Sequence, residues 1–341
     1  MVFVECSGRA VFKTMTIKFS IIIPVKAING YVRETVPYIQ RLNGAEWELF
    51  IITNEEEPSE WPDDDRIRVI SSGRVGPADK RDIGARLANG SILVFLDDDS
   101  YPEPNLLEVA TRYFSDPEVI ALGGPGITPP SNAFWQRVSG AVFLSRFTGG
   151  APERYVPDGI ARQMDDWPSV NLLVRREVFL AVGGFDCKYW PGEDTRLCLK
   201  LKQTGKKLIY VPEMAVWHHR RAGLRAHLKQ IGAYGLHRGY FARHYPETSF
   251  RLKYFVPTAF AVFVLLSLAA FWISAPPAEL LTFGWGLYGI ALLAGLLSIM
   301  KYERPLVALA ALLYVPVTHF YYGIQFLFGY FRQRKLVSKL R

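Results

Sequence analysis

Apolar residues form four short continuous runs in the first hundred positions of the chain, at 19–25, 47–53, 66–70 and 91–97. Continuous runs, as opposed to alternating ones, indicate strands that are buried on both faces, as in parallel sheets. Helical periodicity lies between the runs at 31–42 and 78–88, and Asn89-Gly90 ends the second helix. This alternation predicts an α/β layer fold with a ligand crevice beyond the carboxyl ends of the strands.

The C-terminal part of the chain has a different pattern. Charged residues are absent from 255–273 and 280–300, and His319 is the only ionisable group besides tyrosines in 306–331. Each run has roughly the 20 apolar residues needed to cross a bilayer. We therefore expect transmembrane helices at about 255–273, 280–300 and 305–331, with a break in the third near residue 316, where a proline interrupts it.

This division predicts five segments along the chain. They are an N-terminal tail (1–17), an α/β domain (18–222), a basic interfacial helical segment (223–250), transmembrane helices (251–331) and a basic cytoplasmic tail (332–341). The first residues lack the apolar centre of a secretory signal. The three cysteines, Cys6, Cys187 and Cys198, have no metal-type spacing and suit a reducing cytosol.

The formal charge of +8 is concentrated beside the membrane part. Residues 218–245 carry six Lys/Arg and residues 332–341 carry five, and neither stretch has an acid. Positive charge beside apolar helices favours anionic lipid headgroups or a phosphate-bearing substrate as partners, and we expect no nucleic-acid partner. The absence of a Walker A motif, and of G-x-G-x-x-G between a strand and a helix, disfavours P-loop NTPases and standard dinucleotide enzymes.

Three consecutive aspartates, Asp97, Asp98 and Asp99, end the fourth apolar run. Two carboxylates one residue apart at a strand end can bind Mg²⁺ or Mn²⁺, and substrate phosphates then complete the coordination shell of the cation. The alternative is an acidic helix cap. Lys80 and Arg81, on the preceding helix, add the cations that a diphosphate needs, unless they lie on a solvated helix face.

Further candidates lie downstream. Glu193 and Asp194 open a helix, whose dipole keeps carboxylates ionised. Such a carboxylate can accept a proton from a hydroxyl nucleophile if it faces a cleft, although a capping acid is the commoner case. His218 and His219 end a later strand, and one of them is a candidate metal ligand. The segment 145–168, with Gly and Pro on both sides, is a candidate mobile lid.

Five stretches, in this order, resemble the inverting nucleotide-sugar glycosyltransferases of family 2, which have the GT-A fold. They are "SIIIPV", "GPADKRDIGARLANGSILVFLDDD", "SVNLLVRREVFLAVGGFD", "GEDTRLCLKLKQTG" and "AVWHH". The resemblance covers roughly residues 18–220. The C-terminal part is similar to bacterial exopolysaccharide and lipid-linked-oligosaccharide glycosyltransferases, in which segments like "THFYYGIQFLFG" recur.

The resemblance implies a role for each matching position. Asp97 and Asp99 match the D-x-D motif, with Asp99 as the direct metal ligand and Asp97 nearer the ribose, and His218 would complete the metal shell. Asp194 matches the catalytic base, which Glu193 would orient. The other implied residues are donor contacts at Pro24, Val25, Lys80, Arg81 and Asp98, and acceptor contacts at Gly184, Phe185, Trp190, Arg220 and Arg221.

The chain departs from the family pattern at two points. "TNEEEPSEW" stands where an acidic base-binding segment is common, which leaves Glu55 as a substitute donor contact. The Q-x-x-R-W motif of processive polysaccharide synthases is absent, which favours the addition of a single sugar.

The resulting expectation is a transferase at the cytoplasmic face of the inner membrane that uses Mn²⁺ or Mg²⁺. It would move one sugar from a nucleotide sugar to a hydroxyl of a polyprenyl diphosphate-linked saccharide, in polysaccharide or glycan assembly. The alternatives are a polyprenyl-phosphate sugar synthase, whose phosphate acceptor needs no base, and a catalytically silent nucleotide-sugar-binding scaffold. Three crossings would put the basic tail outside, against the positive-inside rule, so we expect the third run to kink or re-enter and return the tail to the cytosol.

Overall fold

The computed structural model describes residues 18–186, 191–273, 278–334 and 336. The elements of the α/β part are, in chain order, β1 (Lys18–Pro24), α1 (Gly30–Ile39), β2 (Glu46–Thr53), β3 (Ile67–Ser71), α2 (Pro77–Leu87), β4 (Ile92–Leu96), β5 (Ser100–Pro102), α3 (Leu106–Phe114), β6 (Val119–Gly123), β7 (Gly126–Ile127), α4 (Phe134–Ala141), η1 (Arg146–Thr148), η2 (Pro152–Arg154), β8 (Arg162–Gln163), β9 (Asn171–Arg175), α5 (Arg176–Ala181), α6 (Glu193–Gln203), β10 (Lys207–Tyr210) and β11 (Val216–His218). The remaining helices are α7 (Gly223–His244), α8 (Pro246–Ser249), α9 (Leu252–Ile273), α10 (Ala278–Ile299) and α11 (Pro305–Phe331).

An eight-stranded sheet with the order β3-β2-β1-β4-β9-β6-β10-β8 forms the centre of the α/β part. The strands β3, β2, β1 and β4 are parallel neighbours, and they are the four apolar runs of the sequence. The predicted α/β fold is therefore confirmed. The sheet as a whole is mixed, because β9 lies antiparallel between β4 and β6.

Two apolar cores cover the two faces of this sheet. One contains side chains of α1 and α3, such as Val36 and Leu107, and the other contains side chains of α2, α5 and α6, such as Ala85, Phe179 and Leu197. Strands buried on both faces explain why the apolar runs in the sequence are continuous.

A second, three-stranded sheet has the order β5-β11-β7. In it His218 of β11 stands opposite Ser100 of β5. Since Ser100 directly follows the aspartates at the end of β4, this pairing places His218 beside those aspartates.

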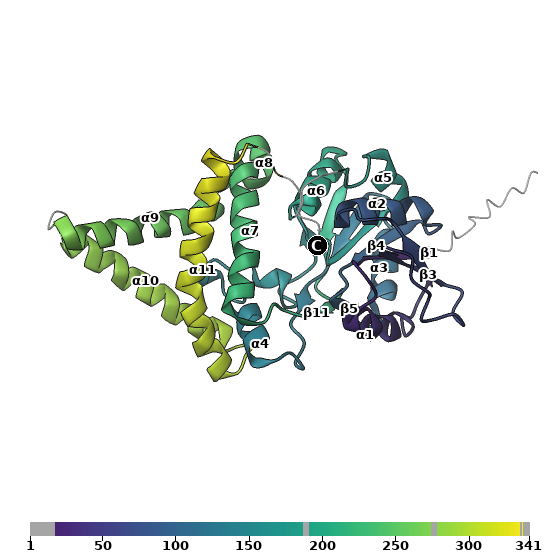
Figure 1. The fold of residues 1–341 in the computed structure, drawn as a ribbon, viewed down its shortest axis with the longest axis horizontal. Coiled ribbons are helices and arrows are strands. Elements are labelled where there is room, and N and C mark those ends of the chain that lie inside the picture. The colour runs from purple at the N-terminus through teal and green to yellow at the C-terminus, as the bar shows by residue number, and fades with distance from the viewer. Residues whose placement is uncertain (1–17, 187–190, 274–277, 335, 337–341) are drawn as a thin grey trace, which may run out of the picture.

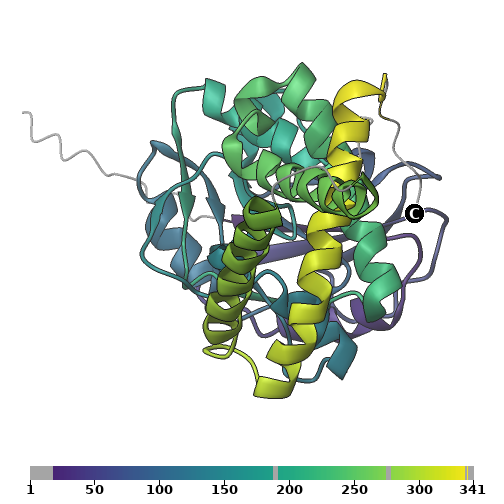
Figure 2. The same cartoon turned by 90° about the vertical axis from the view of Figure 1, so that its left-hand side faces the viewer.

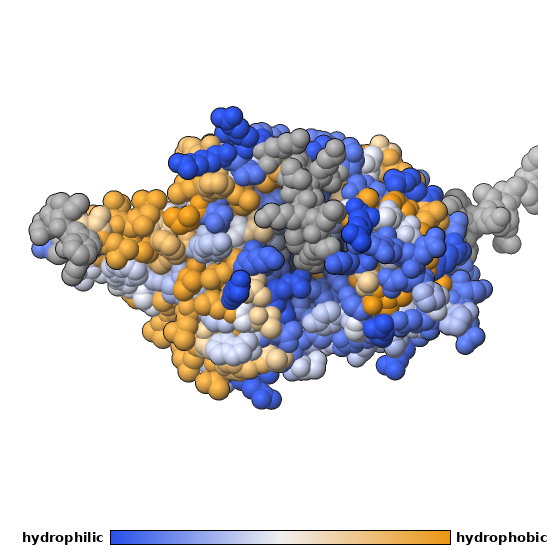
Figure 3. Space-filling view, viewed as in Figure 1, coloured by the Kyte–Doolittle hydropathy of each residue, from blue (hydrophilic) through white to orange (hydrophobic). Residues whose placement is uncertain are grey.

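Three helices are long and apolar enough to cross a membrane, over Leu252–Ala270, Glu279–Ile299 and Pro305–Phe331. They lie on one side of the molecule, and Figure 3 shows their apolar surface against the hydrophilic surface of the α/β part. This arrangement suggests that the protein associates with a membrane. The expected break near residue 316 is not found, because α11 continues through Pro316. Val315 and Thr318, on either side, are buried, so packing holds the helix together where one backbone donor is missing.

The helices α7 and α11 lie side by side (Figure 1) and approach each other closely along a row of glycines. A Cβ atom at Gly239 of α7 would lie 2.0 Å from the carbonyl oxygen of Phe326, and one at Gly329 of α11 would lie 2.0 Å from that of Leu236. Only glycine allows the two backbones this separation.

We expect Gly239→Ala to lower the free energy of unfolding by about 1–3 kcal/mol, the usual range for overpacking, because the added methyl group meets backbone and not a movable side chain. The thermal unfolding midpoint of the detergent-purified protein measures this. Gly286→Ala in α10 is the matched control, since a Cβ at Gly286 has no atom within 4 Å. Equal midpoints for the two variants would contradict the close approach of α7 and α11.

Candidate active site

A cavity of about 2800 Å³ lies between the α/β part and the helices α7, α9 and α11. The α/β part contributes the carboxylates that line it, including Asp97, Asp98, Asp166, Glu193 and Asp194. From residue 224 onward the described lining includes five Lys/Arg and no Asp or Glu. All the carboxylates of the described lining therefore lie on the α/β part, together with cations of its own, whereas the charged groups of the helical wall are cations alone.

The guanidinium of Arg81 joins the two predicted carboxylate motifs. Its Nη2 lies 2.6 Å from Asp97 Oδ1, and its Nη1 lies 3.1 Å from Glu193 Oε1. Arg81 is only 3% exposed. A buried arginine needs both carboxylates to offset its lost hydration, and this fixes the end of β4 against the start of α6.

Lys80 lies at the end of the cavity that the family resemblance assigns to the nucleotide. Its ammonium donates to the carbonyl oxygen of Val25 and, over 2.6 Å, to Oδ1 of Asn54. Burial lowers the pKa of Lys80 to about 8. Lys80 thus holds the ends of β1 and β2 together, and it does not lie on a solvated helix face.

Asp97, Asp99 and His218 form a cluster whose possible ligand atoms all lie within 4.8 Å of one another. Asp99 is 3% exposed; its Oδ1 lies 3.2 Å from His218 Nε2 and its Oδ2 lies 3.1 Å from Arg221 Nη1. Burial lowers the pKa of His218, which favours the neutral ring. Two carboxylates and an imidazole are a donor set that suits a divalent cation such as Mn²⁺.

The neighbours of His218 determine which of its two ring nitrogens carries the proton. Arg220 Nη1 lies 2.7 Å from His218 Nδ1. Since arginine can only donate, Nδ1 accepts and the ring proton lies on Nε2, toward Asp99. In this arrangement neither ring nitrogen of His218 has a free lone pair, so the ring would have to give up its contact with Arg220 before it could bind a cation.

His219, the other candidate ligand, has a different environment. Its Nε2 lies 2.9 Å from Glu34 Oε2 and its Nδ1 lies 2.5 Å from the Asn132 amide. These contacts connect His219 to the start of the chain and to the segment before α4. Among the described residues, His218 is the histidine of the metal-type cluster.

Glu193 and Asp194 begin α6, after Gly192 with a φ of 117°. Burial and the adjacent Asp194 raise the pKa of Glu193, and Arg81 lowers it. Asp194 Oδ1 accepts from the Thr195 backbone over 2.7 Å. Burial and the nearby Asp166 carboxylate raise the pKa of Asp194, while Arg238 and Arg154 counteract this shift. A carboxylate with a raised pKa at a cavity wall is suited to accept a proton.

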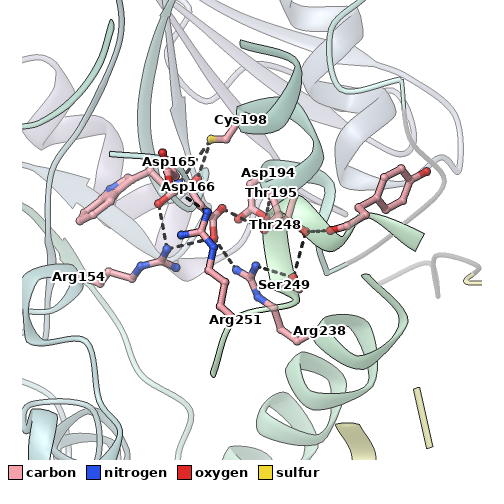
Figure 4. A network of polar contacts seen from close by, with 12 residues as sticks. Arg154, Asp165, Asp166, Asp194, Thr195, Cys198, Arg238, Thr248, Ser249 and Arg251 are labelled. Atoms are coloured by element: carbon pink, nitrogen blue, oxygen red, sulfur yellow. Dashed lines mark hydrogen bonds and ion pairs between the residues drawn. The ribbon is translucent and has the colours of Figure 1, made fainter. Parts of the chain in front are cut away.

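A partly buried ion cluster behind Asp194 was not evident in the sequence (Figure 4). Asp166 accepts from Arg238 Nη2 over 2.6 Å, from Arg154 Nη2 over 3.2 Å and from Thr195 Oγ1 over 3.0 Å. Burial alone would raise the pKa of Asp166, but the two guanidinium groups hold it below its usual range. The cluster connects α6, η2 and α7 at one point.

Several predicted residues do not reach the cavity. Glu55 is exposed and pairs with Arg74 over 2.8 Å. Phe185 is fully buried among Phe95 and Phe179, and Gly184 has a φ of +61° with no space for a Cβ beside Asp82. The predictions that Glu55 contacts the donor and that Gly184 and Phe185 border the acceptor thus have no support in the geometry. Trp190 lies outside the described residues.

The structure also adds residues that the sequence motifs do not include. Asn29 caps α1 through its side-chain oxygen and donates to Asp98 Oδ2 over 2.8 Å, and Asn54 lines the cavity beside Lys80. The segment 145–168, predicted as a mobile lid, contains η1, η2 and the strand β8, which pairs with β10.

A mixed α/β sheet with carboxylates at the end of β4 and the start of α6 is the arrangement expected of the GT-A fold. Residues 92–323, more than half of the chain, match the family model described as glycosyl transferase family group 2. The chain belongs to this family, and it is therefore a transferase.

Known proteins agree with this assignment. A glucosyl-dolichyl phosphate glucuronosyltransferase of Haloferax volcanii is 27% identical over 59% of this chain and 69% of its own length. A pre-mycofactocin glycosyltransferase of Mycobacterium tuberculosis is 30% identical over 47% of this chain, but the match spans only 33% of that longer protein. The fold is similar to that of a mannosyltransferase from Pyrobaculum calidifontis, solved with GDP-Man and Mn²⁺, with a TM-score of 0.54, 16% identity and coverage of 94% and 89% of the two chains.

We expect Asp166→Asn to lower the free energy of unfolding by about 1–3 kcal/mol, because it leaves two partly buried guanidinium groups without their shared counter-charge. Thermal unfolding in detergent measures the loss. Asp165→Asn is the matched control, since the neighbouring Asp165 is 42% exposed in its pairs with Lys202 and Arg251, and exposed pairs contribute about 0–1 kcal/mol. Equal midpoints for the two variants would show that the cluster does not stabilise the fold.

Proposed function

We propose that this glycosyltransferase moves one sugar from a nucleotide sugar to a hydroxyl group of a lipid-linked saccharide, such as a polyprenyl diphosphate saccharide, at the cytoplasmic face of the inner membrane. The observation that carries the proposal is the cavity, which joins the aspartates of β4 and Asp194 to a cationic wall that is built mainly on α7, beside the apolar, membrane-type helices α9 and α11. The Haloferax relative, by its name, acts on a sugar already attached to a lipid phosphate.

The two walls suit two different substrates. The end of the cavity at Val25, Asn54 and Lys80 suits the nucleotide, because backbone and amide groups there stand beside a cation. On the opposite wall, Arg225 and Lys229 lie one helical turn apart on α7, and both side chains are exposed and line the cavity. Cations at that distance suit the phosphates of a lipid-linked acceptor.

Asp97 and Asp99 would hold a divalent cation, with His218 as a further ligand. When bound, the cation neutralises charge on the donor diphosphate as that group leaves. Arg81 keeps Asp97 in position from behind, and Arg221 adds positive charge at Asp99. These contacts support the site but do not distinguish Mn²⁺ from Mg²⁺.

The proposed chemistry is a single displacement with inversion. Asp194 takes the proton of the acceptor hydroxyl, whose oxygen forms a bond to the anomeric carbon. The bond from that carbon to the diphosphate breaks, and its electron pair leaves with the nucleoside diphosphate. Asp194 is suited to this role because it lines the cavity at a helix start that the ion cluster of Asp166 holds in place. Holding acceptor and donor in line supplies much of the acceleration.

We expect nucleotide release from one of UDP-, GDP- or dTDP-sugars by the detergent-purified protein with Mn²⁺ or Mg²⁺ and a membrane lipid extract. Asp194→Asn should lower the rate by a factor of 10² or more, as loss of a general base does. Asp99→Ala should abolish metal-dependent turnover, and Asp65→Asn, an exposed acid on the loop between β2 and β3, is the matched control.

Turnover that survives Asp194→Asn would instead support transfer to a lipid phosphate, which needs no base. Donor binding without turnover in any condition, lipid extract included, would support the scaffold alternative.

The pH dependence tests the surroundings of Asp194. A base acts when it is deprotonated, so activity is present above its pKa and is lost as the pH falls through it. Because the pKa of Asp194 is raised, we expect this loss above the usual aspartate range near pH 4. Asp166→Asn removes a neighbouring negative charge, so its acid limb of kcat/KM should move to lower pH. Asp165→Asn should leave the limb unchanged, and an identical limb in all three proteins would argue against Asp194 as the base.

A further inference from the structure

The three apolar helices differ in how they are covered by the rest of the protein. In the most apolar window of α9, 11% of the residues are buried, and in that of α10 only 6%, whereas in α11 the share is 39%. On α9, exposed apolar side chains such as Leu252, Val262 and Leu268 point to different sides of the helix. α9 and α10 therefore expose apolar surface around most of their circumference, as membrane-spanning helices do.

The exposed side chains of α11, by contrast, follow one line. Those at Leu306, Leu309, Leu313, Val317 and Phe328 are spaced by three, four or eleven residues and fall on one face of the helix. The opposite face, with Ala311, Val315 and Thr318, is buried in the contact with α7 and α4. One face of α11 is thus free to contact apolar surroundings outside the protein, and the rest of the protein covers the opposite face.

The directions of the helices differ in the same way. Figure 1 shows α9 and α10 extending away from the body of the protein, with α11 running across their near ends beside α7. In Figure 2, turned by 90°, α9 is foreshortened while α11 is seen along its length. A membrane that α9 crosses would therefore have α11 along its surface.

The charges agree with this orientation. Cations precede or begin α9 at Arg251 and Lys253, lie between α10 and α11 at Lys301 and Arg304, and follow α11 at Arg332 and Arg334. The segment between α9 and α10 has no Lys or Arg in the sequence. Lys and Arg residues thus flank α11 at both ends, which suits a helix that lies at the level of the lipid headgroups. If α11 spanned the membrane, the cations at one of its ends would have to lie on the opposite side.

Aromatic side chains continue the surface of α11 onto α4. Trp135 is 50% exposed and stacks on Tyr314 of α11 with 6.0 Å between ring centroids, and the neighbouring Phe134 is also exposed. Tryptophan is enriched at the membrane–water boundary.

We propose that α9 and α10 form a hairpin that crosses the membrane twice, and that α11 lies in the membrane surface on the side of the α/β domain. The Leu313 face of α11 contacts the acyl chains, and its other face carries α7 and the α/β domain. The segment after α11 then remains on the side of the α/β domain. The occupant of this surface is the lipid bilayer, and the proposal does not depend on the reaction catalysed.

The first experiment determines the side of each segment. Single cysteines are placed at Arg334, at Glu279 and, as a reference for the side of the α/β domain, at Asp65, in a full-length chain with Cys6 and Cys187 replaced by serine and the buried Cys198 retained. A membrane-impermeant maleimide is added to sealed inside-out and right-side-out vesicles. We expect Arg334→Cys to react in the same vesicles as Asp65→Cys, and Glu279→Cys to react in the opposite ones. If Arg334→Cys reacted in the same vesicles as Glu279→Cys, the proposal would be overturned.

The second experiment measures depth in liposomes of 3:1 phosphatidylcholine and phosphatidylglycerol. Spin labels at Leu306, Leu313 and Phe328 report the ratio of collision rates with oxygen and with a water-soluble nickel complex. We expect the same shallow depth at all three positions, with a clearly greater depth at Ile290, in the middle of α10 and 66% exposed. A depth at Leu313 equal to that at Ile290, with Leu306 and Phe328 shallow, would show that α11 spans the membrane and would overturn the proposal.

Discussion

The arrangement of the site depends on one buried cation, the guanidinium of Arg81. It lies between Asp97, at the end of a central strand, and Glu193, at the start of α6, and water does not reach it to take the place of either carboxylate. Without Arg81, the aspartates of β4 and the Glu-Asp pair would repel each other across the cavity. The helix α2 therefore does more than cover the sheet, since its second turn carries the charge that allows two acidic motifs to converge.

The parts of the site that the sequence predicts are those whose chemistry lies in a short stretch. Asp97 and Asp99 stand one residue apart at the end of an apolar run, and Glu193 and Asp194 open a helix, so local pattern suffices. The residue pattern alone leaves His218 and His219 open, because the choice depends on the register of β11 against β5, and only the family resemblance favours His218.

Residues that join distant segments leave no local pattern. Asp166, Arg154 and Arg238 meet from a loop, a short 3₁₀ turn and a long helix, and no spacing in the sequence connects them. The failure at Phe185 has a similar cause. A family position gives a residue's place in the chain, but the direction of its side chain depends on the packing of Phe95 and Phe179 around it. Likewise, the uncharged run of α11 predicts an apolar helix, while its one-sided exposure follows from contact with α7.

The glycine contacts between α7 and α11 have a consequence for substrate choice. Backbones that touch at Gly239 and Gly329 cannot slide apart or tilt independently, so the two helices form a slab of constant thickness. One side of the slab lines the cavity, and in the proposed orientation the other side rests on the acyl chains. Each helix is about 10–12 Å across. If the proposed reaction and orientation hold, the thickness of this slab would set how far a lipid-linked head group must rise above the membrane to reach Asp194, and acceptors would be selected by length as well as by chemistry.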